Sequence, residues 1–331
     1  MKAIRVAGIG VGGVFRAHLR GYKTLSDLFS LVAVCDINKG AAQRIAEENK
    51  IQLVYTSVEA LLKDGDIDAV DICLPHDLHA PVAIAAAESG CHVLVEKPMA
   101  LSLEEMDGMI ETAQANHVKL MCAFCERYDP QYIKIKELVD GGWVGDVLSV
   151  RADHNQNVVV PQGHWIRQKA RLGGGLVFSA GCHRLDLLRW IVGEVEAVSC
   201  FGAHWDERME GEVTGTVNLQ FKNGAIGTMV MTWVVRRAPW YEGFWIYGKR
   251  GSLHNMNGVH LDSELASQDA GYVKQEIEPK DNFVEEIRHY GECILEDREP
   301  LTSGADARKT MEICIAANRA METQSVVKLP L

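Results

Sequence analysis

The sequence contains no long hydrophobic run. No stretch approaches the roughly 18 consecutive apolar residues that a membrane-spanning helix requires, so we expect no membrane partner. Because an apolar run that predicts a strand begins almost at Met1, we expect no cleaved signal segment before it either.

A dense block of lysine and arginine is also missing. The chain carries 34 basic against 45 acidic residues, which gives a formal net charge of −11 at pH 7. A surface of this sign repels the phosphates of nucleic acids and anionic lipid headgroups. We therefore expect neither nucleic acid nor a membrane surface as a partner.

The nine cysteines form no recognisable framework. They are odd in number and scattered singly, which is typical of reduced thiols in a cytoplasmic protein. Cys122 and Cys125 form one CxxC, but no second pair completes the four ligands of a tetrahedral zinc site. We expect buried, reduced cysteines, no metal site and a cytoplasmic location.

The first 124 residues alternate short apolar runs with helical patterns. This alternation predicts a Rossmann domain over residues 1–124, a doubly wound sheet of parallel strands. Strands are expected near residues 3–8, 31–36, 52–55, 69–74, 92–96 and 118–124.

The remaining residues, 125–331, predict an α+β domain with a large, mostly antiparallel open sheet. Asn223-Gly224 between two apolar runs indicates a hairpin, and one helix is expected over Gly175 to Val192. Strands are expected near 148–155, 196–205, 212–221, 224–235 and 243–247, and closing helices near 281–296 and 304–321. We expect this domain to bind substrate and to form a homodimer or homotetramer through an exposed sheet face, with the closing helices able to pack back on the first domain.

A glycine-rich turn follows the first expected strand. Gly8, Gly10 and Gly13 satisfy GxGxxG between a strand and a helix, the context in which such a turn binds a pyrophosphate. Val11 lies in this turn, and Asp36 with Ile37 ends the second strand, where a carboxylate accepts ribose hydroxyls and repels a 2′-phosphate. The pattern favours NAD over NADP.

Two later loops reach the same edge of the expected sheet. Leu74, Pro75 and His79 follow the fourth strand, where we expect contact with the nicotinamide half of the cofactor. Glu96 and Lys97 follow the fifth strand and are expected to point into the cofactor crevice.

Hydride transfer from an alcohol requires a group that orients the hydroxyl and a base that takes its proton. A lysine ammonium can stabilise the developing alkoxide and a neutral imidazole can accept the proton, so Lys97 and His183 form the best candidate pair. Helical spacing places Ser179, His183 and Asp186 on one face, and Gly181 there suggests close approach of another backbone or of the cofactor ring.

These motifs together resemble the Gfo/Idh/MocA oxidoreductase family. The resemblance rests on residues 8–13, 96–98, 124–130, 173–186 and 299–306. It implies a Rossmann domain followed by an open-sheet domain, NAD(P) as cofactor, and chemistry at a hydroxyl of a sugar, sugar derivative or inositol. It also implies catalytic roles for Lys97 and His183.

The chain departs from the family pattern in its substrate region. Ser179 stands where the inositol dehydrogenase pattern has aspartate, Cys125 stands where many relatives have asparagine, and Glu126 occupies a position where a substrate-contacting arginine can occur. Loss of a carboxylate there changes the proton relay or the substrate. The candidate substrate-binding residues are Glu126, Arg127, Tyr128, His154, Trp165, Ser179 and His183.

The sequence therefore predicts an NAD-dependent dehydrogenase that acts on a secondary hydroxyl of a sugar, glycoside or cyclic polyol. Two alternatives stay open. One is an NAD-retaining glycosidase or lyase that works through transient oxidation at C3, and the other is a non-catalytic sugar or NAD sensor on the same scaffold.

Overall fold

The computed structural model describes residues 3–331 except 65, 208, 238–241 and 267–270. It divides into two compact units. The first contains residues 1–128 together with 280–308, and the second contains residues 129–279 together with 309–331. The chain therefore returns to the first unit after most of the second has been built.

The first unit is built on a six-stranded sheet in the order β3-β2-β1-β4-β5-β6, with all pairs parallel. This order is that of a Rossmann fold, which confirms the predicted class. The strands are β1 (Ile4–Ile9), β2 (Phe29–Cys35), β3 (Leu53–Tyr55), β4 (Ala69–Ile72), β5 (His92–Glu96) and β6 (Leu120–Ala123). Strands β4 and β6 are buried at every position, as expected when helices cover both faces of a parallel sheet.

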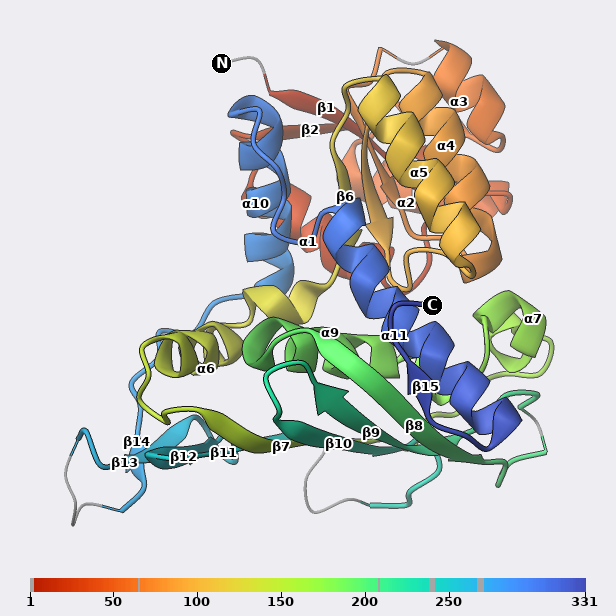
Figure 1. The fold of residues 1–331 in the computed structure, drawn as a ribbon. Coiled ribbons are helices and arrows are strands. Elements are labelled where there is room, and N and C mark those ends of the chain that lie inside the picture. Colours follow the sequence, from red (N-terminus) through yellow and green to blue (C-terminus); the bar gives the residue numbers. More distant parts are fainter. Residues whose placement is uncertain (1–2, 65, 208, 238–241, 267–270) are drawn as a thin grey trace. The chain divides into compact units, whose positions relative to one another are not determined.

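Helices cover this sheet on both sides (Figure 1). Helices α1 and α10 pack together on one face, and α4 and α5 pack together on the other. The helices are α1 (Phe15–Thr24), α2 (Lys39–Asn49), α3 (Val58–Asp64), α4 (His79–Glu88), α5 (Leu103–Ala115) and α10 (Asn282–Leu295), with short 3-10 turns η1 (His76–Leu78) and η2 (Cys125–Tyr128). Ile287 and Tyr290 of α10 join Tyr22, Leu25 and Phe29 in one buried cluster, so α10 completes the core of the first unit.

The second unit is built on a nine-stranded sheet in the order β14-β13-β12-β11-β7-β10-β9-β8-β15. Among the described strands of this sheet, only β7 and β10 pair in parallel, which confirms a mostly antiparallel sheet. The strands are β7 (Val147–Asn155), β8 (Val195–Ala203), β9 (Thr214–Phe221), β10 (Ile226–Thr232), β11 (Glu242–Gly248), β12 (Gly251–His254), β13 (His260–Ser263), β14 (Val273–Lys274) and β15 (Val327–Lys328). The hairpin predicted at Asn223-Gly224 joins β9 to β10.

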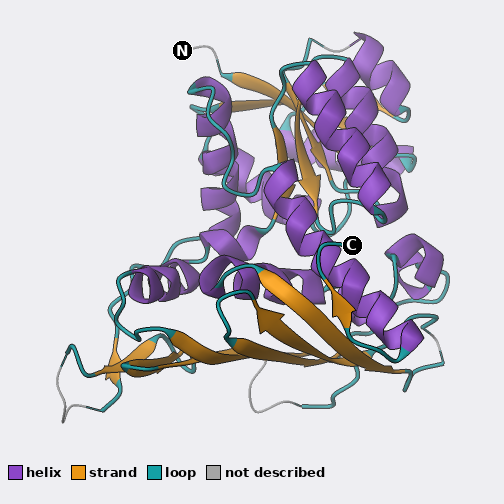
Figure 2. Ribbon diagram, viewed as in Figure 1, coloured by secondary structure: helices purple, strands orange, loops and turns teal. Residues whose placement is uncertain are grey.

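The helices of the second unit lie on one face of this sheet (Figures 1 and 2). They are α6 (Pro130–Asp140), α7 (Lys169–Leu172), α8 (Leu176–Ser179), α9 (Gly181–Val192) and the later part of α11 (Gly304–Thr323), with the 3-10 turn η3 (Trp165–Arg167). Among the described residues, the opposite face carries no helix.

The single helix predicted over Gly175 to Val192 is wrong in one detail, because the structure divides it at Ala180. The His183 amide donates to the carbonyl of Ala180 (3.3 Å), one residue short of the partner in an unbroken α-helix. The carbonyl of Ser179 instead accepts the Cys182 thiol at 3.2 Å.

The expected close approach at Gly181 is present, but its partner is the sheet. A methyl group added at Gly181 would lie 3.0 Å from the sulfur of Met231 and 3.2 Å from the terminal carbon of Met229. Both methionines belong to β10, so glycine lets α9 pack closely on that strand.

All nine cysteines are buried free thiols, as predicted. None of the described helices combines the length and the hydropathy that crossing a bilayer requires.

Candidate active site

The glycine turn after β1 is shaped by two close contacts. Gly10 has φ of +86°, and a methyl group on it would lie 2.4 Å from the carbonyl oxygen of Cys73, while one on Gly8 would lie 2.2 Å from the ring of Phe15. Neither position accepts a side chain without moving its neighbours. Gly12 and Gly13, in contrast, have no atom within 4 Å of such a methyl group. The outer part of the turn is therefore open.

Helix α1 begins at this open turn. Its first turn contains no acidic residue, and Val14 before it offers no capping side chain. The partial positive charge of the helix N-terminus is thus available to an anion such as a pyrophosphate. Gly8, Gly10, Val11 and Gly13 lie where the sequence predicted a dinucleotide site.

Asp36 ties the end of β2 to the glycine turn. One carboxylate oxygen accepts the Val11 amide at 3.0 Å, and the other accepts the Asn38 amide at 2.8 Å. Ile37 beside it is 94% exposed. The carboxylate is therefore held at the edge of the turn, in the position from which a ribose is bound in this fold.

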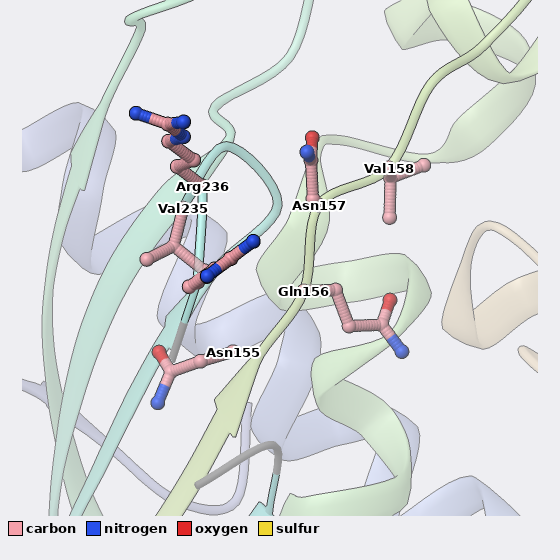
Figure 3. Close-up of a pocket in the computed structure, with 7 residues that line it drawn as sticks. Asn155, Gln156, Asn157, Val158, Val235 and Arg236 are labelled. Atoms are coloured by element: carbon pink, nitrogen blue, oxygen red, sulfur yellow. The ribbon is translucent and has the colours of Figure 1, made fainter. Parts of the chain in front are cut away.

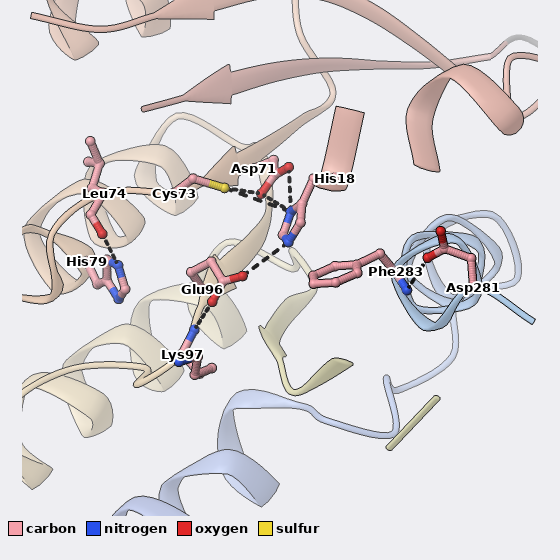
Figure 4. Close-up of polar contacts among 9 residues, drawn as sticks. All are labelled: His18, Asp71, Cys73, Leu74, His79, Glu96, Lys97, Asp281 and Phe283. Atoms are coloured by element: carbon pink, nitrogen blue, oxygen red, sulfur yellow. Dashed lines mark hydrogen bonds and ion pairs between the residues drawn. The ribbon is translucent and has the colours of Figure 1, made fainter. Parts of the chain in front are cut away.

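His79 joins two loops at the carboxyl edge of the sheet (Figure 4). Its Nε2 lies 2.8 Å from the carbonyl oxygen of Leu74, and its Nδ1 lies 2.9 Å from that of Pro98. The ring is fully buried, and burial lowers the pKa of His79. His79 thus connects the loop after β4 to the turn after β5, and this contact is a structural role that the sequence did not predict.

Glu96 and Lys97 form the turn that ends β5. The Lys97 amide donates to Oε2 of Glu96 at 2.9 Å, and the Lys97 side chain is half-buried. The other carboxylate oxygen of Glu96, Oε1, lies 3.2 Å from Nε2 of His18. Glu96 therefore connects the predicted catalytic lysine to a histidine of α1 (Figure 4).

His18 is the main site residue that sequence reasoning missed. It is fully buried, and its Nδ1 lies 2.9 Å from a carboxylate oxygen of Asp71 in β4. The Cys73 thiol donates to the same carboxylate at 3.4 Å. The available signal was the placement of Asp71 and Glu96 inside strands that are otherwise apolar, because buried carboxylates require partners.

The charges of this cluster follow from its contacts. Burial acts to lower the pKa of His18, but the charge and hydrogen bond of Asp71 raise this pKa well above 6.5. Burial acts to raise the pKa of Glu96, but the hydrogen bond and charge of His18, with the charge of Lys97, lower it overall. Glu286 of α10 faces the same cluster, and burial raises its pKa well above 4.5. These contacts therefore favour the charged form of the imidazole, and burial favours the protonated form of Glu286.

We expect the first unit to lose stability as the pH rises from 6.5 to 8. The pKa of His18 is raised in the folded chain, so the folded chain retains this proton to a higher pH than the unfolded chain does, and raising the pH above 6.5 favours unfolding. Each retained proton contributes a slope of at most about 1.4 kcal/mol per pH unit.

Thermal unfolding midpoints measured between pH 6.5 and 8 check this expectation. Asp71, Cys73, Glu96 and Glu286 also face His18, so the comparison with a His18 variant isolates the contribution of the imidazole. The slope should decrease in His18→Asn, and an identical slope in wild type and variant would show that His18 does not retain its proton.

One possible metal-ligating atom each from His18, Asp71 and Cys73 lies within 4.8 Å of the other two, a separation that a shared metal ion would also give. Burial raises the pKa of the Cys73 thiol well above its ordinary value, and a protonated thiol is a poor ligand. A charged imidazole does not coordinate metal either. The cluster is therefore best described as a hydrogen-bonded ionic network.

The second unit holds the other predicted catalytic residue. His183 lies on α9 and is half-buried, and Ser179 lies at the end of α8 and is buried. Asp186, one turn further on, accepts a hydrogen bond from the hydroxyl of Thr310 in α11 at 2.8 Å. This contact fixes α9 against α11 next to His183.

His154 belongs to a second ionic cluster on the helix-covered side of this sheet. Its Nδ1 lies 3.3 Å from Glu242, its register partner on β11, and Arg184 of α9 pairs with the same carboxylate at 2.5 Å. Burial acts to raise the pKa of Glu242, but His154 and Arg184 lower it to about 2. His154 is among the substrate residues predicted from the sequence, whereas Arg184 and Glu242 are not.

The substrate-binding residues predicted in η2 include two that make contacts within the first unit. Arg127 is buried and pairs with Asp306 at 2.6 Å, and the hydroxyl of Tyr128 lies 3.4 Å from that of Thr302. These contacts hold the segment after α10 against η2, and the substrate roles of Arg127 and Tyr128 stay predictions. Glu126 is half-buried in the same turn.

A pocket of about 380 Å³ lies at the end of β7 in the second unit (Figure 3). It is lined by residues 155–158 and 235–237, which include three side-chain amides and two arginines, and it begins one residue beyond His154. Such a lining suits hydroxyl-rich or anionic molecules. Trp165 is half-buried in η3, where its ring stacks on that of His164 at 5.8 Å.

Comparison with known proteins agrees with this architecture. Residues 4–124 match the model of the Gfo/Idh/MocA oxidoreductase family with its NAD-binding Rossmann fold, and residues 132–254 match the C-terminal domain of that family.

Relatives match this chain over almost its whole length. It is 28% identical to a myo-inositol 2-dehydrogenase of Thermotoga maritima over 98% of both chains, and 26% identical to a scyllo-inositol 2-dehydrogenase (NAD(+)) of Bacillus subtilis over 98% of this chain and 96% of that protein. A solved levoglucosan dehydrogenase in complex with NADH and levoglucosan superposes with a TM-score of 0.92 at 25% identity, with full coverage of both chains. From the glycine turn, the six-stranded sheet and these matches, it follows that the chain belongs to the Gfo/Idh/MocA family of NAD-binding oxidoreductases.

Proposed function

We propose that this protein is an NAD-dependent dehydrogenase that transfers a hydride between nicotinamide and a secondary hydroxyl of a sugar, glycoside or inositol-like polyol. One observation carries the proposal. The strands β1, β4 and β5 are neighbours in one parallel sheet, so the glycine turn after β1 and Lys97 after β5 lie at the same edge, two strand spacings or about 10 Å apart. A dinucleotide bound at the turn extends its nicotinamide toward that lysine.

The residues divide the chemistry between them. Lys97 donates a hydrogen bond to the reacting hydroxyl and stabilises the alkoxide as it develops. His183 accepts the hydroxyl proton in oxidation and returns it in reduction. NAD supplies the hydride acceptor when it is bound. Lys97 comes from the first unit and His183 from the second, so their meeting at one substrate is part of the proposal.

We also propose that NAD is preferred over NADP. The Asp36 carboxylate is fixed by two backbone amides at the edge of the glycine turn, where the ribose is proposed to bind. A phosphate on that ribose would meet a fixed negative charge. Ile37 and Asn38, which follow Asp36, supply no positive charge to offset it.

An absorbance screen for NADH tests the function. The purified protein is incubated with inositols, aldoses and glucosides, once with NAD and once with NADP. We expect NADH to accumulate in proportion to a substrate of this group, with a lower KM for NAD than for NADP. No reduction of either cofactor across the whole panel would contradict the proposal, and a lower KM for NADP would contradict the cofactor preference.

The two alternative functions raised by the sequence are less well supported. The relatives described above are named as dehydrogenases of inositols and of levoglucosan, with no glycosidase, lyase or sensor among them. A glycosidase or lyase would release product in the same screen without net NADH.

A homo-oligomer is proposed on the helix-free face of the nine-stranded sheet. Ile226 and Tyr247 both pair with Ser149 and so point to the same side, where each is exposed, and Phe201 is exposed on β8 of that sheet. Exposed apolar side chains on an open sheet favour burial against a second copy. A sedimentation measurement that finds only monomer at micromolar protein would contradict this part of the proposal.

A further inference from the structure

A buried imidazole lies directly behind the Glu96-Lys97 turn. His18 comes from α1, the helix that follows the glycine turn, and its two ring nitrogens face carboxylates on two different strands. Nδ1 lies 2.9 Å from Asp71 on β4, and Nε2 lies 3.2 Å from Glu96 on β5 (Figure 4). One side chain therefore joins the helix at the cofactor turn to the two strands whose loops carry the proposed active site.

Glu96 extends this connection to Lys97. Its Oε1 contacts His18, and its Oε2 accepts the Lys97 backbone amide at 2.9 Å. Both oxygens of one buried carboxylate are thus occupied, one by the imidazole and one by the amide of the residue that carries the ammonium group. The contacts form a continuous series from Asp71 through His18 and Glu96 to Lys97.

The two contacts of the ring favour the doubly protonated form of the His18 imidazole. A neutral imidazole has one N–H and can donate to only one of the two carboxylates, whereas an imidazolium donates to both. The surroundings support the charged form, because Asp71, Glu96, Cys73 and Glu286 face the ring and none of them carries a positive charge. Phe283 of α10 covers the ring, with 5.6 Å between the ring centroids, so water does not replace these contacts.

We propose that His18 is a positioning residue for Lys97. The imidazolium fixes the Glu96 carboxylate, and this carboxylate fixes the backbone from which the Lys97 side chain starts. The inference rests on the proposed function, in which Lys97 contacts the reacting hydroxyl. It predicts that losing the contact between His18 and Glu96 loosens Lys97 and lowers kcat, while NAD still binds at the glycine turn.

Two substitutions separate this role from a general contribution to the core. The amide nitrogen of asparagine lies near the position of Nδ1 in histidine, and that of glutamine lies near the position of Nε2. His18→Asn therefore keeps the donor toward Asp71 and loses the donor toward Glu96, while His18→Gln does the reverse. Both substitutions remove the positive charge of the imidazole. The two variants therefore differ mainly in whether they keep the contact with Glu96.

The measurement is hydrogen exchange of the Lys97 amide, followed by NMR on the full-length, isotope-labelled protein. We expect exchange to accelerate about tenfold or more in His18→Asn and by no more than about threefold in His18→Gln. Tyr22→Phe is the control, because Tyr22 lies on the same helix and faces Asp71 without contacting Glu96. Equal exchange rates at Lys97 in the two His18 variants would overturn the proposal.

Steady-state kinetics with the substrate found in the NADH screen then separate this proposal from the proposed function. A loss of kcat in His18→Asn, with unchanged KM for NAD and recovery in His18→Gln, supports both. Faster Lys97 exchange in His18→Asn with unchanged kcat supports positioning and contradicts the catalytic role of Lys97.

If neither His18 variant folds, the wild-type protein still decides the question. Nitrogen-15 chemical shifts of the His18 ring report how many of its nitrogens carry a proton. Two protonated nitrogens at pH 7.5 support the double contact, and one protonated nitrogen overturns the proposal.

Discussion

Replacing Lys97 by methionine, or His183 by alanine, should each lower kcat by about 10² to 10⁴-fold, the range measured for loss of a group that acts in proton transfer. Methionine preserves the length and the apolar stem of Lys97 but removes the ammonium that stabilises the alkoxide. Alanine at position 183 removes the imidazole that accepts the proton. Both residues lie outside the glycine turn, so NAD affinity should change by less than about threefold. Steady-state kinetics and an NAD titration measure the two quantities.

Lys119→Met is the matched control for the lysine. Lys119 belongs to the same unit and pairs with Asp297 at 2.7 Å, away from the Glu96-Lys97 turn in sequence and at the opposite end of a neighbouring strand. Its loss should leave kcat within about twofold, since an ion pair with an exposed partner contributes little. If both Lys97→Met and His183→Ala retain full activity, the proposed mechanism is wrong.

Gly10→Ala should destabilise the first unit by about 3 kcal/mol or more and abolish NAD binding. The added methyl group would lie 2.4 Å from the carbonyl oxygen of Cys73, which is a backbone atom and cannot rotate away, and the φ of +86° is itself unfavourable for alanine. The turn must therefore move, and with it the backbone amides that are proposed to bind the pyrophosphate. Thermal unfolding and an NAD titration measure both effects.

Gly12→Ala is the control for this prediction. It lies in the same turn, but no atom lies within 4 Å of its added methyl group, so the unfolding free energy should change by no more than about 0.5 kcal/mol. Equal losses of stability in the two variants would show that neither the Cys73 carbonyl nor the positive φ makes glycine necessary at position 10.

The sequence predicted the first unit well because its signals are local. A strand that breaks into GxGxxG and then a helix specifies one supersecondary unit, and repeated alternation of apolar runs and helices specifies the rest. The second unit was predicted less completely. Strands β12 to β15 have two to four residues, too few for a period to be recognised. Helix α6 was missed although Asp129-Pro130 supplies a cap and a first-turn proline, a signal that was available.

In the candidate site, too, the residues with local sequence signals were predicted and the contacts between distant residues were not. Gly10, Asp36 and Lys97 could be proposed from the sequence because each belongs to a short motif at the end of a strand. His18 was missed because its partners are 53 and 78 residues away, and no spacing rule connects a helix residue to carboxylates on two separate strands. Arg127 stays a predicted substrate residue, but its ion pair with Asp306 was not foreseen because Asp306 lies in a distant segment.

The first unit is discontinuous in the chain, and this has a consequence for protein synthesis. Ile287 and Tyr290 complete the apolar cluster of Tyr22, Leu25 and Phe29, and residues 301–306 complete the surroundings of η2. When the first 128 residues have left the ribosome, part of the apolar core of the first unit is therefore still exposed to water. The first unit reaches its final packing only after every strand of the nine-stranded sheet except β15 has left the ribosome. The two units must therefore fold in an interleaved order.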